Sequence, residues 1–366
     1  MTAGPPPDVL VVGLGPAGAA AALAAVSAGC RVLAVERNQL PGLPVQCAEF
    51  VPNPIFDEVP STRGARVQPI ARMRTHLERA AAEVTGNFRG QMIDRAEFDR
   101  ALIAQAQAAG AECRFGLPLR SLTADGVLLA DGTVLQPRVV VGADGPLSVV
   151  GRALGFVNAA LVDSRQITVD LLQPHDATDI FLRRSFPGGY GWLFPKGERC
   201  NLGLGLARAH RSALKPELEA LHAEMVAEGR VGAAVHRTTG GLIPVGGIVG
   251  PQGRLGRALV MLAGDAAGLT HPVTGAGIAA AVVSGRMAGL TAAAWIHGDQ
   301  TAGEDYAEEL RDIYGATLDH ALRRRAAILS SDLGPQAQRA GWIAYPEYWA
   351  RKPQTDAYPP SLETIA

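Results

Sequence analysis

The chain has 366 residues, of which 48% are hydrophobic and 19% charged, and its formal net charge is −1. This length is too great for one small core and predicts two closely linked lobes. The near-neutral balance gives no basic excess to attract nucleic acid, so the composition excludes nucleic acid as an expected partner.

Cysteine usage and the absence of a targeting pattern favour a cytoplasmic protein. The chain contains four cysteines: Cys30, Cys47, Cys113 and Cys200. They form no CxxC pair and no metal-ligand spacing, so no metal site is expected. No cleavable apolar segment is recognised before Val9. The most apolar stretch, Gly277 to Ile296, is interrupted by Ser284 and Arg286 and is predicted to be a buried helix, with peripheral membrane contact left open.

The N-terminal part of the chain predicts a βαβ unit. Residues 1–7 include consecutive prolines and are expected to form a flexible leader. A short apolar strand, Val9 to Val12, precedes a glycine turn, Gly13 to Gly18. An alanine-rich helix to about Ala28 and a second strand, Arg31 to Val35, complete the unit.

The middle of the chain alternates helical and strand patterns. Asp94 to Ala109 is predicted to be a helix, and residues 113–135 a small antiparallel sheet with Asp-Gly turns. Val139 to Val141 is predicted to be a buried parallel strand. Residues 158–245 contain strand-like stretches around one helix, Leu214 to Glu228, which predicts a separate sheet facing the substrate.

The last third is mainly helical. Leu259 to Ala263 is predicted to be one more buried strand. Helical patterns follow from Ile278 to about Leu329. The segment from Pro335 onward is rich in Pro, Tyr and Trp and is expected to be irregular but packed.

The glycine turn carries the first chemical motif, Gly13-Leu14-Gly15-Pro16-Ala17-Gly18. The first glycine permits a tight turn, the second lets the backbone approach a pyrophosphate, and the third allows close packing of helix on strand. Glu36, at the end of the second strand, is suitably placed to accept hydrogen bonds from ribose hydroxyls. Arg37 is either a surface cation or a cap over the adenine-ribose region.

Two further motifs place an aspartate directly after a buried strand. Asp144 and Gly145 follow the strand at 139–141, where a hairpin tip is the alternative interpretation. Asp265 follows the strand at 259–263 and can reach a ribityl hydroxyl. The third motif continues through residues 272–278 into the apolar helix.

In this order, the three motifs resemble the class A flavoprotein monooxygenases and the geranylgeranyl reductases, and the resemblance covers nearly the whole chain. These families share one glutathione-reductase-like FAD-binding fold. The resemblance implies that the helix start near Ile278 lies at the flavin pyrimidine edge, where it would stabilise negative charge on reduced flavin. The implied FAD-binding residues are Gly13, Gly15, Pro16, Ala17, Gly18, Glu36, Arg37, Cys47, Ala48, Arg95, Leu119, Asp144, Gly145, Asp265, Pro272, Gly275, Ala276, Gly277 and Ile278.

Two sequence features favour the reductase branch. Hydroxylating relatives commonly carry a histidine where this chain has Gly268. Residues 187–195 match the PxxYxWxFP pattern of the geranylgeranyl reductases. Alternate residues of a strand share a face, so Tyr190, Trp192 and Phe194 are predicted to form an aromatic wall that binds substrate. The alternative is a sheet that packs on its own core.

Four residues are candidates for catalysis: Cys47, Tyr190, Trp192 and His271. Cys47 matches a cysteine that lies near the flavin in many reductases, and a buried inert thiol is the alternative. His271 stands where many relatives have asparagine, and is either a local acid-base group or a core histidine. Arg95 matches an arginine near the flavin, with a surface helix charge as the alternative.

The predicted fold is α/β, or α+β, with a Rossmann-type FAD-binding lobe, an inserted antiparallel-sheet substrate lobe and a helical C-terminal region. The leader is residues 1–7. The FAD-binding domain is discontinuous, comprising 8–157 and 246–296. The substrate-binding domain is 158–245, and the helical C-terminal region is 297–366.

The leading functional interpretation is transfer of hydride from reduced flavin to a carbon-carbon double bond of a bulky, apolar, isoprenoid-like substrate. No second strand-GxGxxG-helix unit is present, so NAD(P)H or reduced ferredoxin is expected as a transient donor. One alternative is a single-component monooxygenase that uses NAD(P)H and O2 to hydroxylate an aromatic substrate, including a tryptophan side chain in a peptide. Another is a non-catalytic prenyl-group binder. The sequence leaves the oligomeric state open.

Overall fold

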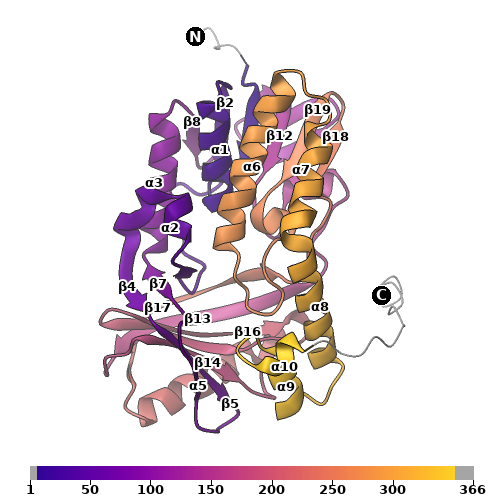
Figure 1. Ribbon diagram of the computed structural model, residues 1–366. Coiled ribbons are helices and arrows are strands. Elements are labelled where there is room, and N and C mark those ends of the chain that lie inside the picture. The colour runs from indigo at the N-terminus through magenta and orange to yellow at the C-terminus, as the bar shows by residue number, and fades with distance from the viewer. Residues whose placement is uncertain (1–5, 351–366) are drawn as a thin grey trace.

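The computed structural model describes residues 6–350, which form two stacked lobes (Figure 1). The first lobe is built on a six-stranded sheet in which five neighbouring strands run parallel and β18 is an antiparallel edge. In sheet order its strands are β18 (Gln252–Leu255), β19 (Ala258–Leu262), β12 (Val139–Gly142), β1 (Val9–Val12), β2 (Val32–Glu36) and β8 (Glu112–Phe115). The central strands are continuous valine and leucine runs because both faces of the sheet are covered.

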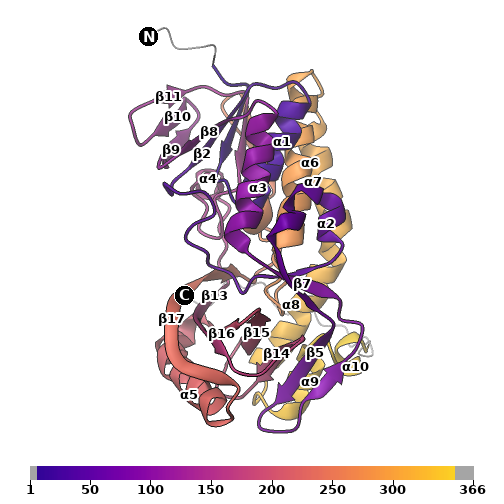
Figure 2. The same cartoon turned by 90° about the vertical axis from the view of Figure 1, so that its left-hand side faces the viewer.

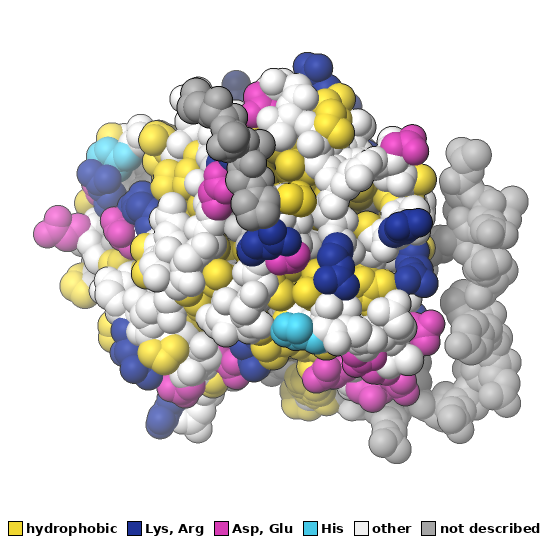
Figure 3. Space-filling model, turned by 90° about the horizontal axis from the view of Figure 1, so that it is seen from above, with side chains coloured by type: hydrophobic (Ala, Val, Ile, Leu, Met, Phe, Trp, Pro, Cys, Tyr) yellow, Lys and Arg dark blue, Asp and Glu magenta, His cyan; other side chains and the backbone are white. Residues whose placement is uncertain are grey.

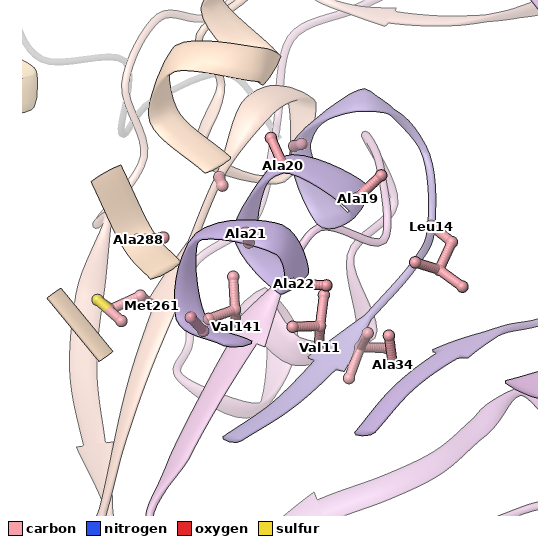
Figure 4. Packing of buried hydrophobic residues seen from close by; sticks show 14 of the residues in the cluster. Val11, Leu14, Ala19, Ala20, Ala21, Ala22, Ala34, Val141, Met261 and Ala288 are labelled. Atoms are coloured by element: carbon pink, nitrogen blue, oxygen red, sulfur yellow. The ribbon is translucent and has the colours of Figure 1, made fainter. Parts of the chain in front are cut away.

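Three helices cover one face of this sheet: α1 (Pro16–Ser27), α3 (Arg95–Ala108) and α6 (Ile278–Ile296). Small residues let α1 and α6 approach closely, because a Cβ on Gly285 would lie 2.0 Å from the Ala17 carbonyl oxygen. Figure 4 shows Ala21 and Ala22 of α1 beside Val11 and Val141 of the sheet. The predicted strand-helix-strand unit is confirmed.

The other side of the sheet carries a small antiparallel sheet and one short helix (Figure 2). Its elements are β9 (Leu119–Thr123), β10 (Gly126–Leu129), β11 (Val134–Leu135) and α4 (Val149–Ala153). The antiparallel pairing predicted between residues 113 and 135 is confirmed for β9 to β11. The first strand of that range, β8, instead extends the parallel sheet beside β2.

The second lobe is a seven-stranded, mainly antiparallel sheet with α5 (Leu214–Ala227) packed on it. In sheet order its strands are β17 (Val231–Pro244), β13 (Leu161–Leu171), β16 (Arg199–Ala207), β15 (Gly191–Lys196), β14 (Ala177–Leu182), β5 (Arg72–Leu77) and β6 (Glu83–Thr85). Strands β5 and β6 come from a segment that precedes the sequence range predicted for this lobe, and β5 pairs parallel to β14.

Short elements connect the two lobes on the N-terminal side. A three-stranded sheet has the order β3-β7-β4. These elements are β3 (Phe50–Pro52), α2 (Ile55–Glu58), η1 (Pro60–Ala65), β4 (Arg66–Ile70) and β7 (Gly90–Ile93). Two single helical turns elsewhere in the chain are η2 (Arg208–Ala213) and η3 (Gly264–Ala267).

The C-terminal helices run from the first lobe down to the second (Figure 1). They are α7 (Ala302–Leu310), the π-helical turn η4 (Arg311–Gly315), α8 (Ala316–Leu329), α9 (Pro335–Gly341) and α10 (Pro346–Trp349). The predicted helical stretch to Leu329 is confirmed. The expected packing of the following segment is confirmed up to residue 350, because Trp342, Tyr345 and Tyr348 are buried. The rest of that prediction lies outside the described residues.

Helix α6 is long and apolar enough to cross a membrane, judged by length and composition alone. In this fold, however, it lies against α1 and α7, and more than half of its most apolar window is buried inside the protein. Seen from above, the surface carries charged side chains of both signs interspersed with apolar ones (Figure 3). The apolarity of α6 is therefore explained by its contacts with the core.

One buried carboxylate organises the far edge of the second lobe. Asp179 in β14 is fully buried and accepts hydrogen bonds from His175 Nε2 at 2.5 Å, Arg230 at 2.6 Å and His76 Nε2 at 2.7 Å. Burial disfavours its charged form, but the hydrogen bonds from His175 and His76 and the charge of Arg230 outweigh burial and hold the pKa of Asp179 well below its usual value. The interaction ties β5 and the start of β17 to β14.

We expect Asp179→Asn to lower the free energy of unfolding by about 3 kcal/mol, because it leaves the half-buried Arg230 with only a longer pair, 3.8 Å, to Glu228. Asp176→Asn, which removes an exposed pair with Arg72, should cost less than about 1 kcal/mol. Because the folded-state pKa of Asp179 is depressed, its stabilisation is present above about pH 4 and lost as the pH falls below that value. Urea titration of both variants tests this, and equal losses would contradict it.

Candidate cofactor-binding and active site

The three glycines of the first motif have different roles. Gly13 has a φ of +93°, and a Cβ there would lie 2.4 Å from the Ala143 carbonyl oxygen. A Cβ on Gly18 would lie 1.8 Å from the Gly13 carbonyl oxygen. A Cβ on Gly15, in contrast, would meet nothing within 4 Å. The first and third glycines are thus required by packing, while Gly15 faces open space in which a pyrophosphate fits.

Glu36 is fixed beside this turn. One carboxylate oxygen accepts from the Leu14 backbone N–H at 2.9 Å and the other from the Asn38 N–H at 3.0 Å. Each oxygen retains acceptor capacity for a ribose hydroxyl. Arg37 is exposed, and Leu119 is half-buried at the start of β9.

Asp144 caps the short helix α4. It accepts from Ser148 Oγ at 2.5 Å and from the Val149 N–H at 2.6 Å. The segment is a strand-turn-helix connection, so the hairpin-tip alternative is wrong. Gly145 has a φ of +81° and a Cβ there would also meet nothing within 4 Å. A second glycine therefore borders open space at this edge of the sheet.

Asp265 lies after β19 and beside the start of α6. Its carboxylate accepts from Thr270 Oγ1 at 2.6 Å, and burial raises its pKa. Asn158 Nδ2 donates to the carbonyl oxygens of Asp265 at 2.9 Å and Pro146 at 3.1 Å, which joins the second and third motifs. Thr270 and Asn158 were missed by sequence reasoning, because neither belongs to a recognised motif.

The four motif ends lie along one edge of the sheet. Strands β19, β12, β1 and β2 are parallel neighbours, so their carboxyl ends carry Asp265, Asp144, Gly13 and Glu36 in that spatial order. Dinucleotides bind outside the carboxyl ends of such strands. The edge between Glu36 and the helix start after Gly277 is therefore where the sequence motifs predict an extended FAD.

We expect Gly15→Val to weaken FAD binding without unfolding the protein. The backbone at Gly15 has a φ of −72° and a ψ of −171°, which valine tolerates, and its side chain would fill the open space. Circular dichroism should be unchanged, while FAD affinity falls at least about tenfold. Gly86→Val, in an exposed turn with equal room, is the control. Unchanged FAD affinity of Gly15→Val would contradict this placement.

Cys47 and Arg95 lie together where the two lobes meet. Arg95, in the first turn of α3, pairs with Asp99 at 2.7 Å. Burial raises the pKa of the Cys47 thiol, although the nearby Arg95 guanidinium lowers it. Burial also raises the pKa of Asp265, which the same guanidinium lowers. The thiol is therefore neutral at neutral pH, and Arg95 is a half-buried charge rather than an exposed one.

Glu49 is a further residue near the candidate site that the sequence did not reveal. It is 1% exposed, has a φ of 70°, and its carboxylate accepts from Lys196 Nζ at 2.8 Å, Asn201 Nδ2 at 2.9 Å and the Arg95 N–H at 3.0 Å. Its donors come from β15, β16 and α3. Glu49 therefore holds the loop of Cys47 against both lobes, and its own sequence context gives no signal of this role.

The aromatic side chains at Tyr190, Trp192 and Phe194 form a continuous row. Ring centroids are 5.8 Å apart for the first pair and 6.5 Å for the second. Trp192 and Phe194 are buried, and Trp192 Nε1 donates to Gln166 at 2.9 Å. Trp342 from the C-terminal segment packs on Tyr190 with centroids 4.8 Å apart. The row thus lies in a hydrophobic cluster with Trp342 and Tyr345, as a sheet that packs on its own core would, and its role as a substrate wall stays a prediction.

Tyr190 also connects this wall to the loop before α6, since its hydroxyl donates to the Thr274 carbonyl oxygen at 2.6 Å. In the same loop, His271 Nδ1 accepts from the N–H groups of Val273 at 3.3 Å and Thr274 at 3.2 Å. Burial lowers the pKa of His271 to about 4. His271 is therefore neutral and accepts hydrogen bonds from the backbone. This favours the interpretation that His271 positions the loop over the interpretation that it is an acid-base group.

The folded-state pKa of His271 is depressed, so its contribution to stability is present above about pH 6.5 and is lost as the pH falls towards 4, by on the order of 3 kcal/mol. We expect His271→Asn to reduce this pH dependence, because the amide oxygen accepts the same hydrogen bonds without titrating. Urea unfolding at neutral and mildly acidic pH measures it. The exposed His297→Asn variant is the control, and an identical pH dependence in His271→Asn and the parent protein would refute the assignment.

Comparisons with known proteins identify relatives of this chain. Residues 161–241 match the family model of the geranylgeranyl reductase catalytic domain. The chain is 34% identical to digeranylgeranylglycerophospholipid reductase 2 of Methanopyrus kandleri, over 86% of this chain and 85% of the relative. It is 33% identical to digeranylgeranylglycerophospholipid reductase of Methanocella arvoryzae, over 85% and 84%.

Solved structures show the same fold. A geranylgeranyl bacteriochlorophyll reductase-like protein from Thermoplasma acidophilum superposes with a TM-score of 0.81 at 25% identity, covering 92% of this chain and 91% of that one. A variant of the halogenase PltM in complex with FAD has a TM-score of 0.68 at 17% identity, covering 92% and 79%. The FAD-binding fold expected from the three motifs is confirmed.

Proposed function

The chain belongs to the geranylgeranyl reductase family, and from this premise we propose that it reduces a carbon-carbon double bond of a bulky, apolar, isoprenoid-like substrate. The protein is an FAD-dependent oxidoreductase. The observation that carries the proposal is its 34% identity to a digeranylgeranylglycerophospholipid reductase over most of both chains. The aromatic wall beside the loop before α6 supplies an apolar surface of the kind such a chain would contact.

The residues along the edge of the first sheet would hold the cofactor. The proposed pyrophosphate site is the turn at Gly15 and Gly145, with Glu36 at a ribose. The N–H groups at the start of α6, after Gly277, would stabilise negative charge on the pyrimidine edge of reduced flavin. When bound, FAD supplies the two-electron chemistry that the protein itself lacks.

Reduction of a double bond needs a proton as well as a hydride. The proposed proton donor is Cys47, because burial keeps its thiol protonated. The nearby Arg95 guanidinium would stabilise the thiolate that forms when the thiol gives up its proton. The Tyr190 hydroxyl already donates to the Thr274 carbonyl oxygen, and Trp192 Nε1 to Gln166. We therefore assign Tyr190, Trp192 and Phe194 to the substrate wall.

The electron donor belongs to the same proposal. NAD(P)H or reduced ferredoxin would act transiently, since the sequence holds one strand-GxGxxG-helix unit. The proposed location is the cytoplasm, with access to a membrane surface, because the relatives are named for the reduction of a phospholipid.

The test is anaerobic turnover. Dithionite-reduced protein is mixed with a geranylgeranyl lipid while flavin reoxidation and product mass are followed, and the lipid is expected to gain two hydrogens per double bond. Cys47→Ala should slow this step by about 100-fold or more, and Cys113→Ala, a half-buried thiol in β8, should not. Substrate hydroxylation that depends on O2 would establish the monooxygenase alternative, and a colourless protein that takes up no FAD would indicate a prenyl binder.

A further inference from the structure

A small pocket with a cavity volume of about 40 Å³ lies between the segment that joins β14 to β15 and the C-terminal helices α8 and α9. Its lining is mostly apolar and includes Phe186, Ile328 and Leu333. At one end it reaches Tyr190 and Val273, which belong to the aromatic wall and to the loop before α6. The pocket therefore adjoins the proposed active site, and the N-terminal motifs contribute nothing to it.

Buried polar atoms in this lining lack partners among the described residues. Trp342 is 4% exposed, and its Nε1 donor has no hydrogen-bond acceptor in residues 6–350. Gln338 Oε1 and Arg183 Nε are likewise buried and unpartnered within that range. Burial of an unsatisfied polar group costs about 1 to 3 kcal/mol, so such a cluster is expected where a ligand supplies the missing partner.

Arg325 on α8 brings a positive charge to the same lining. Its guanidinium makes one long hydrogen bond, 3.3 Å, to the Pro272 carbonyl oxygen, and in the described part of the chain it forms no ion pair. Burial lowers its pKa to about 10, and no acidic group opposes that effect. Arg183, by comparison, is paired with Glu224 at 2.5 Å. Buried guanidinium groups are otherwise paired, and a planar fork matches carboxylate or phosphate oxygens.

We propose that this pocket binds the anionic head group of an amphiphilic ligand, with Arg325 pairing with its phosphate or carboxylate oxygens and Trp342 Nε1 donating to one of them. The apolar chain then passes Tyr190 towards the aromatic wall. The identification of this amphiphile with the reduced substrate rests on the proposed function, but the anion site does not. The C-terminal segment thereby selects the ligand by its head group.

Binding to the oxidised FAD-loaded protein tests the site without turnover. Geranylgeranyl phosphate, geranylgeraniol and inorganic phosphate are the probes, and tryptophan fluorescence with calorimetry reports affinity. We expect the phosphate ester to bind about 10- to 100-fold more tightly than the alcohol. Arg325→Met should remove most of that preference, and Arg325→Lys should retain part of it. Arg323→Met, an exposed position on the same helix, is the control and should change nothing.

The stability of the ligand-free protein shows whether Arg325 serves ligand binding or stabilises the fold. Because Arg325→Met removes a half-buried charge that forms no ion pair within residues 6–350, the ligand-free variant should be as stable as the parent protein or more so. Marked destabilisation would show that Arg325 is satisfied within the chain and would overturn the proposal. Equal affinity for ester and alcohol, or phosphate binding as tight as the ester, would also overturn it. Selective ester binding without turnover would refute the proposed function alone.

Discussion

The parallel alignment of β1 with β12 and β2, and of β12 with β19, is the constraint on which the rest of the structure depends. It places three chain segments, more than a hundred residues apart in sequence, with their turns at one edge. Helices α1 and α6 cover this sheet in close contact, which small residues such as Gly285 and Gly289 permit. The proposed cofactor edge therefore depends on strand pairing between distant segments and on the packing of two alanine- and glycine-rich helices over it.

The second lobe is attached to this edge by polar contacts as well as by apolar packing. Glu49 joins α3, β15 and β16 through one buried carboxylate. Tyr190 joins the aromatic wall to the loop before α6 through a single hydrogen bond to Thr274. Both contacts lie near Cys47 and the flavin end of the proposed cofactor site. The relative position of the lobes therefore determines how a substrate would be oriented against the cofactor.

Titratable groups near the site fall into distinct electrostatic roles. Burial keeps the Cys47 thiol protonated and His271 neutral, so one can release a proton while the other accepts hydrogen bonds from the backbone. The Arg95 charge is balanced by Asp99. Arg325 has no such partner in residues 6–350, which distinguishes a charge that serves the fold from one that is available to a ligand.

The sequence by itself determined the strand-helix-strand unit, the glycine turn at Gly13, the helices after Ile278 and the FAD-binding fold, because each rests on contiguous patterns or on motifs in a fixed order. It could not place β5 beside β14, surround Glu49 with donors from distant elements, or bring Trp342 onto Tyr190. Nor could it show that Arg325 is half-buried and without an ion pair in residues 6–350. These features depend on side chains brought together by long-range packing, and no local periodicity records which of them will meet.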